Sequence, residues 1–280
     1  MRQSDTQIMQ SENREETPRS AGDSRPLKIC VIGAGNVATH LAQALGRVAH
    51  VAQIVSRHEV SARRLAEKIE GCEPVWDLKE LAPDADLYLI SVGDDHVAEV
   101  AGETPDYPGI WAHTSGSVPA DVFEGKKSRY GVFYPLQTFT RDLDVDVSEV
   151  PFFIEGSDTA TAEALAALAR EISHSVEYAD SRRRGLLHVA AVFACNFANL
   201  MWHEADEILR RDGLDVKYMM PLLRMTLSKL EKISPREAMT GPARRGDSEV
   251  IAGHLEKLSG RPKEIYELLS DTILDMYRDE

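Results

Sequence analysis

Cysteine is scarce in this sequence. The 280 residues include three cysteines, Cys30, Cys72 and Cys195, which are widely spaced and form no CxxC pair. An odd number of isolated cysteines excludes a disulfide framework and is typical of a reducing compartment. We interpret the three thiols as small buried hydrophobic groups, and we predict no metal site.

Long apolar runs and a surplus of positive charge are also missing. No stretch approaches the ~18 uninterrupted apolar residues of a membrane span, and the N-terminus lacks the apolar core of a secretory signal. The 46 Asp and Glu residues outnumber the 32 Lys and Arg residues, so the net charge is −14. Such a charge repels phosphate backbones. We therefore expect a soluble, cytoplasmic protein that binds neither nucleic acid nor membranes.

The order of strand-like and helix-like segments predicts the fold. Residues 1–25 are almost entirely polar and are predicted to be a disordered tail. Between residues 26 and 179, short apolar runs predict strands at 27–32, 50–55, 85–91, 109–113, 129–133, 150–154 and 175–178. Helical spacing of apolar residues predicts helices at 37–45, 60–69 and 158–172. This alternation predicts a Rossmann-type α/β domain, with a mostly parallel sheet covered on both faces.

Residues 180–280 show no strand pattern. One helix is predicted over 181–211 with Gly213 as its cap, and further helices at 216–232, 248–258 and 262–276. The first of these helices is too apolar to stand in water alone. It must pack against the other helices, a partner subunit, or both, so this region is predicted to form a separate all-α domain.

The clearest motif is a glycine-rich turn between the first strand and the first helix. In the pattern Gly33-x-Gly35-x-x-Ala38, the first glycine permits a tight turn and the second admits a pyrophosphate close to the backbone. Ala38 allows the helix to pack closely on the strand. The helix begins at Asn36 and Val37, where free backbone amides and the helix dipole attract an anion. This motif predicts a dinucleotide site.

The second strand is followed by Ser56 and Arg57, where an NAD site usually has a carboxylate. A hydroxyl and a guanidinium suit a 2′-phosphate, so we predict NADP, with NAD the less favoured cofactor. Ser91 and Val92 leave the third strong strand at the same edge, and their backbone is expected to lie against the nicotinamide ribose. Asp94 or Asp95 is expected to cap the helix predicted at 97–100.

Candidate catalytic groups come from later segments. His113 and Ser115 belong to the sequence HTSGS after the next strand, which can bind a cofactor or a substrate carbonyl, or can simply form a turn. The sequence YPLQTF from Tyr134 is either core or pocket wall. In the long apolar helix, His188, Asn196 and Asn199 lean to one side, and buried groups of this kind need partners, because an unpaired amide costs ~1–3 kcal/mol. Those partners are substrate, cofactor or another helix.

The segment from Thr240 to Asp247 has an unusual composition, with two glycines, a proline, Arg244 and Arg245. We interpret it as a loop between two helices. Its arginines could present positive charge to an anionic ligand, or the segment could be a solvated turn in which Asp247 offsets their charge.

Taken together, these motifs resemble a family of bacterial Rossmann-like NADP oxidoreductases whose helical C-terminal domain has no assigned function. The likeness runs from Leu27 onward and rests on the glycine loop, SerArg after the second strand, SVGDD, HTSGS, YPLQTF, HVAAVFACNFANL and TGPARRGD. Wider relatives are pyrroline-5-carboxylate reductase, prephenate dehydrogenase, the β-hydroxyacid dehydrogenases and the deazaflavin-dependent NADP oxidoreductases. The resemblance implies NADP binding and a C-terminal domain like that of 6-phosphogluconate dehydrogenase, through which two subunits form a homodimer.

One departure from these relatives affects the predicted chemistry. The β-hydroxyacid dehydrogenases carry a catalytic lysine on the long helix, whereas this chain has His188 and, one turn later, Val192. We predict an NADP-dependent oxidoreductase acting on a small carbonyl, imine or hydroxy compound. His188 is the expected general acid or base, since an imidazole of ordinary pKa ~6.5 exchanges protons near neutrality. Ser115 and Asn196 are expected to orient the substrate. A non-catalytic NADP sensor and a flavin or deazaflavin reductase are the alternatives.

Overall fold

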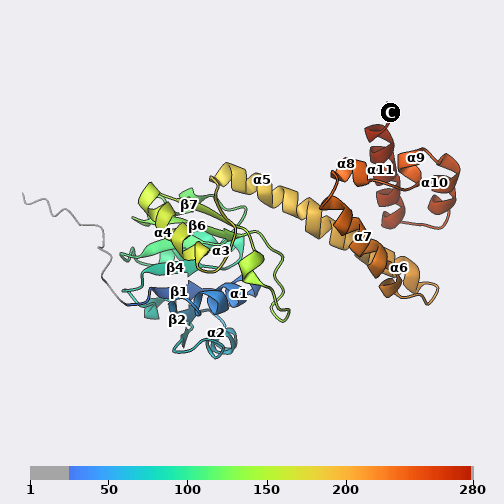
Figure 1. The fold of residues 1–280 in the computed structure, drawn as a ribbon. Helices are drawn as coiled ribbons and strands as arrows, with labels where there is room; N and C mark the ends of the chain where they lie inside the picture. Colours follow the sequence, from blue (N-terminus) through green and yellow to red (C-terminus); the bar gives the residue numbers. More distant parts are fainter. Residues whose placement is uncertain (1–24, 279–280) are drawn as a thin grey trace, which may run out of the picture. The chain divides into compact units, whose positions relative to one another are not determined.

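The computed structural model describes residues 25–278, and the predicted N-terminal tail lies almost wholly outside them (Figure 1). The described chain divides into two compact units. The first ends at Ala190 and the second begins at Ala191, a division that falls inside the predicted long helix.

The first unit is built on one sheet with the strand order β3-β2-β1-β4-β5-β6-β7-β8, in which β6 and β7 are antiparallel and the other neighbours are parallel. The strands are β1 (Lys28–Ile32), β2 (His50–Val55), β3 (Glu73–Val75), β4 (Leu87–Ile90), β5 (Ile110–His113), β6 (Tyr130–Pro135), β7 (Phe152–Gly156) and β8 (Val176–Tyr178). The predicted Rossmann-type, mostly parallel sheet is confirmed.

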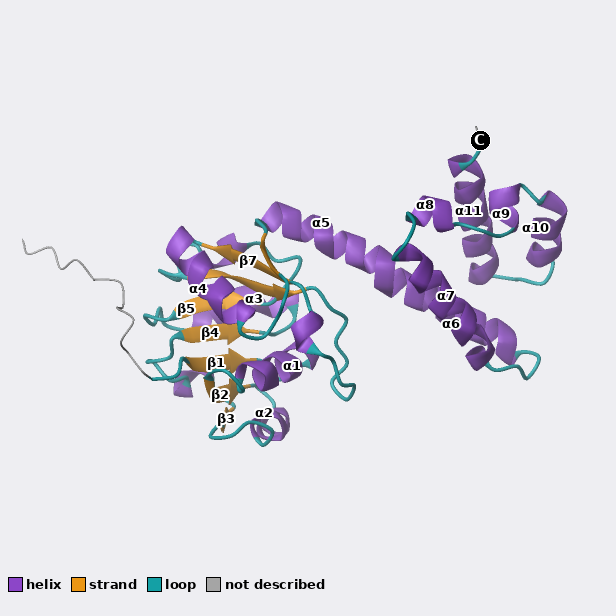
Figure 2. Cartoon of the chain, viewed as in Figure 1, coloured by secondary structure: helices purple, strands orange, loops and turns teal. Residues whose placement is uncertain are grey.

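Helices cover both faces of this sheet (Figure 2). They are α1 (Asn36–Leu45), α2 (Glu59–Ala66), α3 (Asp94–Glu103) and α4 (Thr159–Arg170), with 3₁₀ turns at Leu78–Glu80, Ala120–Phe123 and Val147–Glu149. Because side chains alternate along a strand, Ile29 and Val31 pack with α1, α2 and α4, whereas Cys30 and Ile32 pack with α3. This alternation between two apolar layers explains why β1 reads as an unbroken apolar run.

The strand β3 and two short helices, α8 (Pro235–Ala238) and α9 (Pro242–Arg245), were not predicted. β3 has three residues with a proline in the middle, and it lies at the sheet edge, where a missing N–H is tolerated. In the second unit, the prediction that residues 240–247 form a loop was wrong. Pro242 starts a one-turn helix, α9 (Pro242–Arg245), which Gly246 ends in the left-handed conformation at φ 70°.

The second unit is helical throughout its described residues. The helix that begins as α5 (Ser181–Ala191) continues through a π-helical stretch at Val192–Phe197 into α6 (Ala198–Arg210). A 3₁₀ turn at Val216–Met219 follows, and then α7 (Met220–Leu230), α8 (Pro235–Ala238), α9, α10 (Ser248–Leu255) and α11 (Arg261–Met276). Helices α9, α10 and α11 pack on one another.

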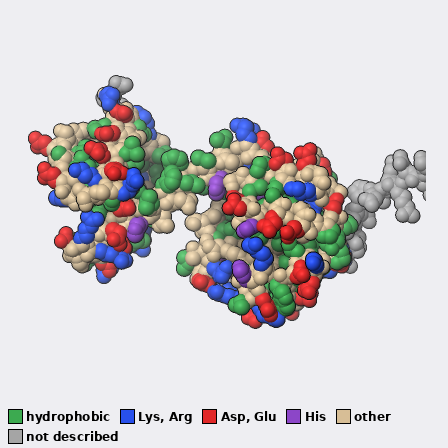
Figure 3. Space-filling model, turned by 180° about the vertical axis from the view of Figure 1, so that it is seen from behind, with side chains coloured by type: hydrophobic (Ala, Val, Ile, Leu, Met, Phe, Trp, Pro, Cys, Tyr) green, Lys and Arg blue, Asp and Glu red, His purple; other side chains and the backbone are tan. Residues whose placement is uncertain are grey.

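Much of the helical surface is apolar. By length and composition, the helix Ser181–Arg210 is the one helix among the described residues that could cross a membrane, with a mean hydropathy of 1.4 over its most apolar stretch. Its side chains Phe193 and Phe197 are exposed by 67% and 47%. Figure 3 shows hydrophobic side chains gathered over this helix. Cys195 is exposed and Cys72 is half-buried, so the interpretation of the thiols as buried groups holds for Cys30 alone.

Candidate functional site

The first unit lines up the ends of three strands along one sheet edge. In the parallel register, Ile32 of β1 pairs with Ile90 of β4, and Ile90 pairs with His113 of β5. The residues that follow Ile32, Ile90 and His113 therefore leave the sheet side by side at the same edge. In an open α/β sheet, ligands bind at this carboxyl edge, where the strand order reverses between β1 and β4.

The glycine loop forms a tight turn at this edge. Gly33 has φ 129°, and a Cβ there would collide with the carbonyl of Ser91. Its N–H donates to the carbonyl of Val55 at 2.7 Å. Only glycine fits this position, because it combines a positive φ with a close backbone approach. The conformation follows from the packing of β1 between β2 and β4.

The start of α1 is open to an anion. Its N-cap is Gly35, which offers no side-chain cap, and the first turn, beginning with Asn36 and Val37, has no acidic residue. A Cβ at Gly35 would meet no atom within 4 Å, whereas Ala38 is fully buried against the sheet. The first amides of a helix lack intrahelical partners and attract negative charge. These residues fit the diphosphate of a dinucleotide.

Arg57 does not extend freely from the end of β2. Its Nη2 lies 3.4 Å from Nε2 of His96 on α3, and Nδ1 of His96 lies 2.9 Å from a carboxylate oxygen of Glu99. The neighbouring Ser56 donates its backbone N–H to Val75 at 2.9 Å and accepts at Oγ from the amide of His58. The assignment of Ser56 and Arg57 to the cofactor stays a prediction.

Ser91 lies at the carboxyl end of β4, between the glycine loop and β5. Its N–H donates to the carbonyl of Ile32 at 2.7 Å, and its hydroxyl accepts from Thr114 Oγ1 at 3.1 Å. The half-buried Val92 follows it. Helix α3 takes Gly93 as its N-cap with no side-chain cap, so the prediction that Asp94 or Asp95 caps it was wrong. The Asp94 carboxylate instead accepts a hydrogen bond from Ser117.

His113 is fully buried, so its ring cannot meet a cofactor directly. Nδ1 accepts from the amide of Ser115 at 3.1 Å, and the ring stacks on Phe123 at 5.7 Å. Among the described residues, Nε2 has no hydrogen-bond partner of good geometry. Burial lowers the pKa of His113 to about 4, with a smaller contribution from the charge of Arg184. The imidazole therefore stays neutral near pH 7, and a contact between His113 and the cofactor stays a prediction.

Ser115 shapes the loop that follows β5. Its hydroxyl accepts from the amides of Ser117 and Val118 at 3.1 and 3.0 Å, which closes a tight turn. Gly116, which follows Ser115 in this turn, is buried. A Cβ at Gly116 would meet Nδ1 of His188 at 2.7 Å and the Tyr134 hydroxyl at 2.8 Å. The turn therefore lies directly against two further polar side chains.

Those side chains form the central pair of the candidate site. The Tyr134 hydroxyl, at the end of β6, lies 3.2 Å from Nδ1 of His188 on α5, and the two rings meet edge to face. Burial raises the pKa of Tyr134, so its phenol remains protonated and can donate to Nδ1. Among the described residues, no hydrogen bond occupies Nε2 of His188. That nitrogen is available to a bound molecule.

A buried ion pair fixes α5 one turn before His188. Arg184, with a side chain 1% exposed, pairs with Glu155 of β7 and donates to the carbonyl of Val118 at 2.6 Å. Ser181 completes the network by donating to Glu155 at 2.9 Å and accepting from the amide of Ala120. The helix start is thereby fixed to the sheet and to the loop after β5. Arg184 and Glu155 were not assigned functional roles from the sequence, although position 184 lies one turn from 188, and the segment from Tyr134 was left open between core and pocket wall.

The remaining predicted residues belong to the second unit. Asn196 and Asn199 are exposed there, and the role of Asn196 stays a prediction. Arg245 pairs with Asp247 at 2.7 Å, and Arg244 stacks over the ring of Tyr277 at 3.7 Å. These contacts hold the α9 turn in shape, which gives both arginines structural partners within their own unit.

Comparison with known proteins places these features in a family. A Rossmann-like domain model matches residues 15–132, and the model of a domain of unknown function, DUF2520, matches residues 150–273. A search of curated proteins finds no match. A solved structure from Bacteroides fragilis, described as a "putative NADP oxidoreductase", is 43% identical, with a TM-score of 0.83 over 89% of this chain and 98% of that one.

Two more distant structures share the fold. A protein from Thermotoga maritima is 22% identical, with a TM-score of 0.67 over 89% of this chain and 98% of that one. A reductive aminase from Aspergillus terreus, solved with NADPH and ethyl-5-oxohexanoate, is 14% identical. Its TM-score is 0.69 over 91% of this chain and 94% of that one. The 43% identity over nearly the whole B. fragilis protein shows kinship beyond fold. This chain belongs to the family of Rossmann-like proteins that carry a DUF2520 C-terminal domain.

Proposed function

We propose that this chain is an NADP-dependent oxidoreductase that moves a hydride between the nicotinamide and a small carbonyl, imine or hydroxy compound. The observation that carries the proposal is an uncapped glycine loop on the same sheet edge as a Tyr134–His188 hydrogen bond. The description of the B. fragilis relative as an NADP oxidoreductase supports the cofactor. The net charge of −14 gives no reason to expect a polyanionic partner.

Each group then has a defined task. The open amides of α1 hold the diphosphate, and the glycine at position 33 lets the loop lie close enough to do so. When bound, the nicotinamide supplies or accepts the hydride. Tyr134 holds Nδ1 of His188, so that Nε2 carries the proton that the substrate oxygen or nitrogen takes up on reduction. Oxidation reverses this transfer.

The loop after β5 gives the substrate a polar surface. Gly116 lets this loop lie directly against the His188 ring and the Tyr134 hydroxyl, where a Cβ would collide with both. Ser115, which shapes this turn, and Asn196 on the long helix are proposed to orient the substrate. A substrate carbonyl bound here would accept from Nε2, as general acid catalysis requires.

We further propose that the protein is a cytoplasmic homodimer joined through its helical units. The exposed apolar side chains of the long helix and α7, among them Phe193, Phe197, Leu222 and Met225, would be costly to leave in water. A second copy presents the same apolar surface and can cover it. Membrane insertion fits less well, because lipid offers no partners for Asn196 and Asn199.

Nucleotide titration followed by turnover tests the proposal. The full chain should bind NADPH in calorimetry and then oxidise it in the presence of a member of a carbonyl and imine panel. His188→Gln should lower kcat by about 10²–10⁴-fold and Tyr134→Phe by about tenfold, with NADPH affinity unchanged. Val189→Ala, on the same helix, is the control and should retain full turnover.

Two results would contradict the proposal. If no panel member is turned over but NADPH binds, the chain is a nucleotide sensor instead of an enzyme. If His188→Gln retains full turnover of a discovered substrate, another group transfers the proton.

A further inference from the structure

We propose that a basic pocket between α1 and α2, formed by Ala34, Ser61, Arg64, Lys68 and Arg141, binds the phosphate on ribose O2′ of NADP and thereby sets cofactor preference. This inference rests on the proposed NADP-dependent function and deepens it. It replaces Arg57 with a different set of cations as the main phosphate ligands.

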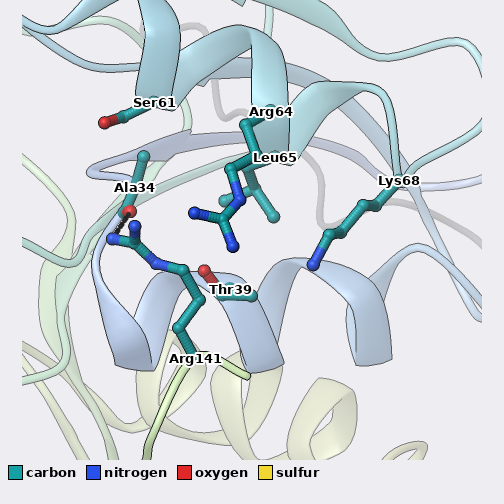
Figure 4. A pocket seen from close by; sticks show the side chains of 7 residues that line it. All are labelled: Ala34, Thr39, Ser61, Arg64, Leu65, Lys68 and Arg141. Carbon is teal, nitrogen blue, oxygen red and sulfur yellow. Dashed lines mark hydrogen bonds between the residues drawn. The ribbon is translucent and has the colours of Figure 1, made fainter. Parts of the chain in front are cut away.

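The pocket lies beside the glycine loop. It is small and partly open to solvent, and Ala34, the residue between the two loop glycines, forms one wall. Figure 4 shows Arg64, Lys68 and Arg141 directed into the same space above α1, with Ser61 beside them. In this fold the adenosine ribose lies at the loop and the end of β2, which brings its 2′ position toward α2. The pocket therefore opens where that phosphate is expected.

Arg141 is held in position by the fold. It lies in the segment after β6, more than 100 residues from the glycine loop, yet its Nη2 donates to the carbonyl of Ala34 at 2.8 Å. The preceding residues are fixed on α1, because Nε2 of His40 contacts the carbonyl of Thr140 at 3.0 Å and the His40 ring stacks on Phe139 at 5.0 Å. A guanidinium arranged this way in advance loses little freedom when it binds a phosphate.

The balance of charge also favours this pocket over Arg57. Three cations face the pocket, and one carboxylate, Asp142, accepts from Arg64 at 2.8 Å, so positive charge remains in excess. Arg57, by contrast, contacts His96, which itself contacts the carboxylate of Glu99. A phosphate dianion gains more from three cations offset by one carboxylate than from Arg57 alone with Glu99 behind His96.

Calorimetric titration of NADPH and NADH into the full chain tests this inference. Arg141→Met and the double change Arg64→Met with Lys68→Met should each weaken NADPH by about 30-fold or more and leave NADH within about threefold. The double variant leaves the Arg141–Ala34 contact intact, so it separates phosphate binding from loop support. The same variants should no longer bind adenosine 2′,5′-bisphosphate but should still bind adenosine 5′-monophosphate.

Arg63→Met is the matched control. Arg63 neighbours Arg64 on α2, but it pairs with Glu59 and lies over Trp76, outside the pocket. Its NADPH affinity should match that of the wild type. Circular dichroism confirms that each variant is folded before titration.

The outcomes separate this inference from the function on which it rests. If only Arg57→Met loses NADPH selectively, Arg57 binds the phosphate and the inference is wrong. It is also wrong if the pocket variants weaken NADPH and NADH equally. If the wild-type chain binds neither nucleotide, the proposed function fails together with the inference.

Discussion

The two units bury their apolar side chains to very different extents. In the first unit, side chains from both faces of the sheet are enclosed by α1 to α4, and large residues such as Trp111 and Phe133 are fully buried. In the described part of the second unit, the buried hydrophobic residues are Ala243 and Tyr277. One unit has a core of its own, whereas the described part of the helical unit leaves most of its apolar side chains exposed, and we propose that a second copy covers them.

The two units also differ in where their polar contacts lie. The first unit encloses an ion pair, a neutral histidine and a lysine, each held by neighbours. The second unit places its ion pairs Arg210–Asp206 and Arg245–Asp247 at the surface. Surface pairs of this kind contribute little stability. Chemistry that needs fixed groups is therefore supported best by the first unit.

The largest effect is expected from charging the apolar helix. Phe193 and Phe197 pack edge to face at 5.0 Å on the exposed side of the long helix. Replacing both with Asp should abolish the dimer, because buried carboxylates without partners are strongly disfavoured. Light scattering should report a monomer. Val48→Asp, an exposed site in the first unit, is the control that should remain dimeric. A dimer unaffected by the Phe193 and Phe197 changes would remove this face from the interface.

The next largest effect is expected at the glycine loop. Gly33→Ala combines a disfavoured φ of 129° with a collision against Ser91, and it should cost about 2–4 kcal/mol of stability. It should also weaken NADPH binding by about 100-fold or more. Gly102→Ala in α3, where a Cβ meets open space, is the control. That change should stabilise the protein by up to about 1 kcal/mol. Equal urea midpoints for the two variants would refute this account of the turn.

A third test compares a buried ion pair with an exposed one. Glu155→Gln leaves Arg184 buried without a counter-charge and should lower the unfolding free energy by about 3 kcal/mol. Glu59→Gln breaks the exposed pair with Arg63 and should cost about 0.5 kcal/mol or less. Urea denaturation measures both. Similar losses from the two changes would mean that the buried Arg184–Glu155 pair stabilises the protein no more than the exposed Arg63–Glu59 pair does.

The smallest effect concerns Lys127, whose Nζ donates to the carbonyls of Thr104 and Pro105 and lies over the Trp111 ring. Burial lowers the pKa of Lys127 to about 8 from an ordinary 10.5. Between these values the unfolded chain keeps a proton that the folded chain releases, so stability should rise with pH. We expect the free energy of unfolding to rise by about 1–2 kcal/mol over this range. The rise is modest because the two carbonyls favour the charged form of Lys127 and oppose the effect of burial. Lys127→Met should remove it, and parallel pH profiles for the two proteins would contradict the assignment.

The sequence predicted the first unit well for a physical reason. Buried parallel strands leave continuous apolar runs, and Gly33-x-Gly35 marks the turn that joins β1 to α1. These signals are local. The strand β3 escaped prediction because a three-residue edge strand with a central proline carries almost no apolar pattern. The turn at α9 escaped because Pro242 and Gly246 are typical both of loops and of helix ends.

The candidate site was less predictable, because its contacts join distant segments. The sequence indicated His188, but its partner Tyr134 lies 54 positions away, and only the folded sheet brings them together. Arg141 reaches Ala34 across 107 positions. His113 looked like a ligand group by its place at a strand end, yet packing against Phe123 encloses its ring. No local pattern encodes any of these three contacts.

The most direct test is calorimetric titration of NADPH into the folded wild-type chain. The account predicts saturable binding with one nucleotide per subunit, lost in Gly33→Ala and retained in Gly102→Ala. An absence of binding heat from folded wild-type protein, with NADPH and NADP⁺ alike and at more than one temperature, would contradict the claim that the open start of α1 holds a dinucleotide.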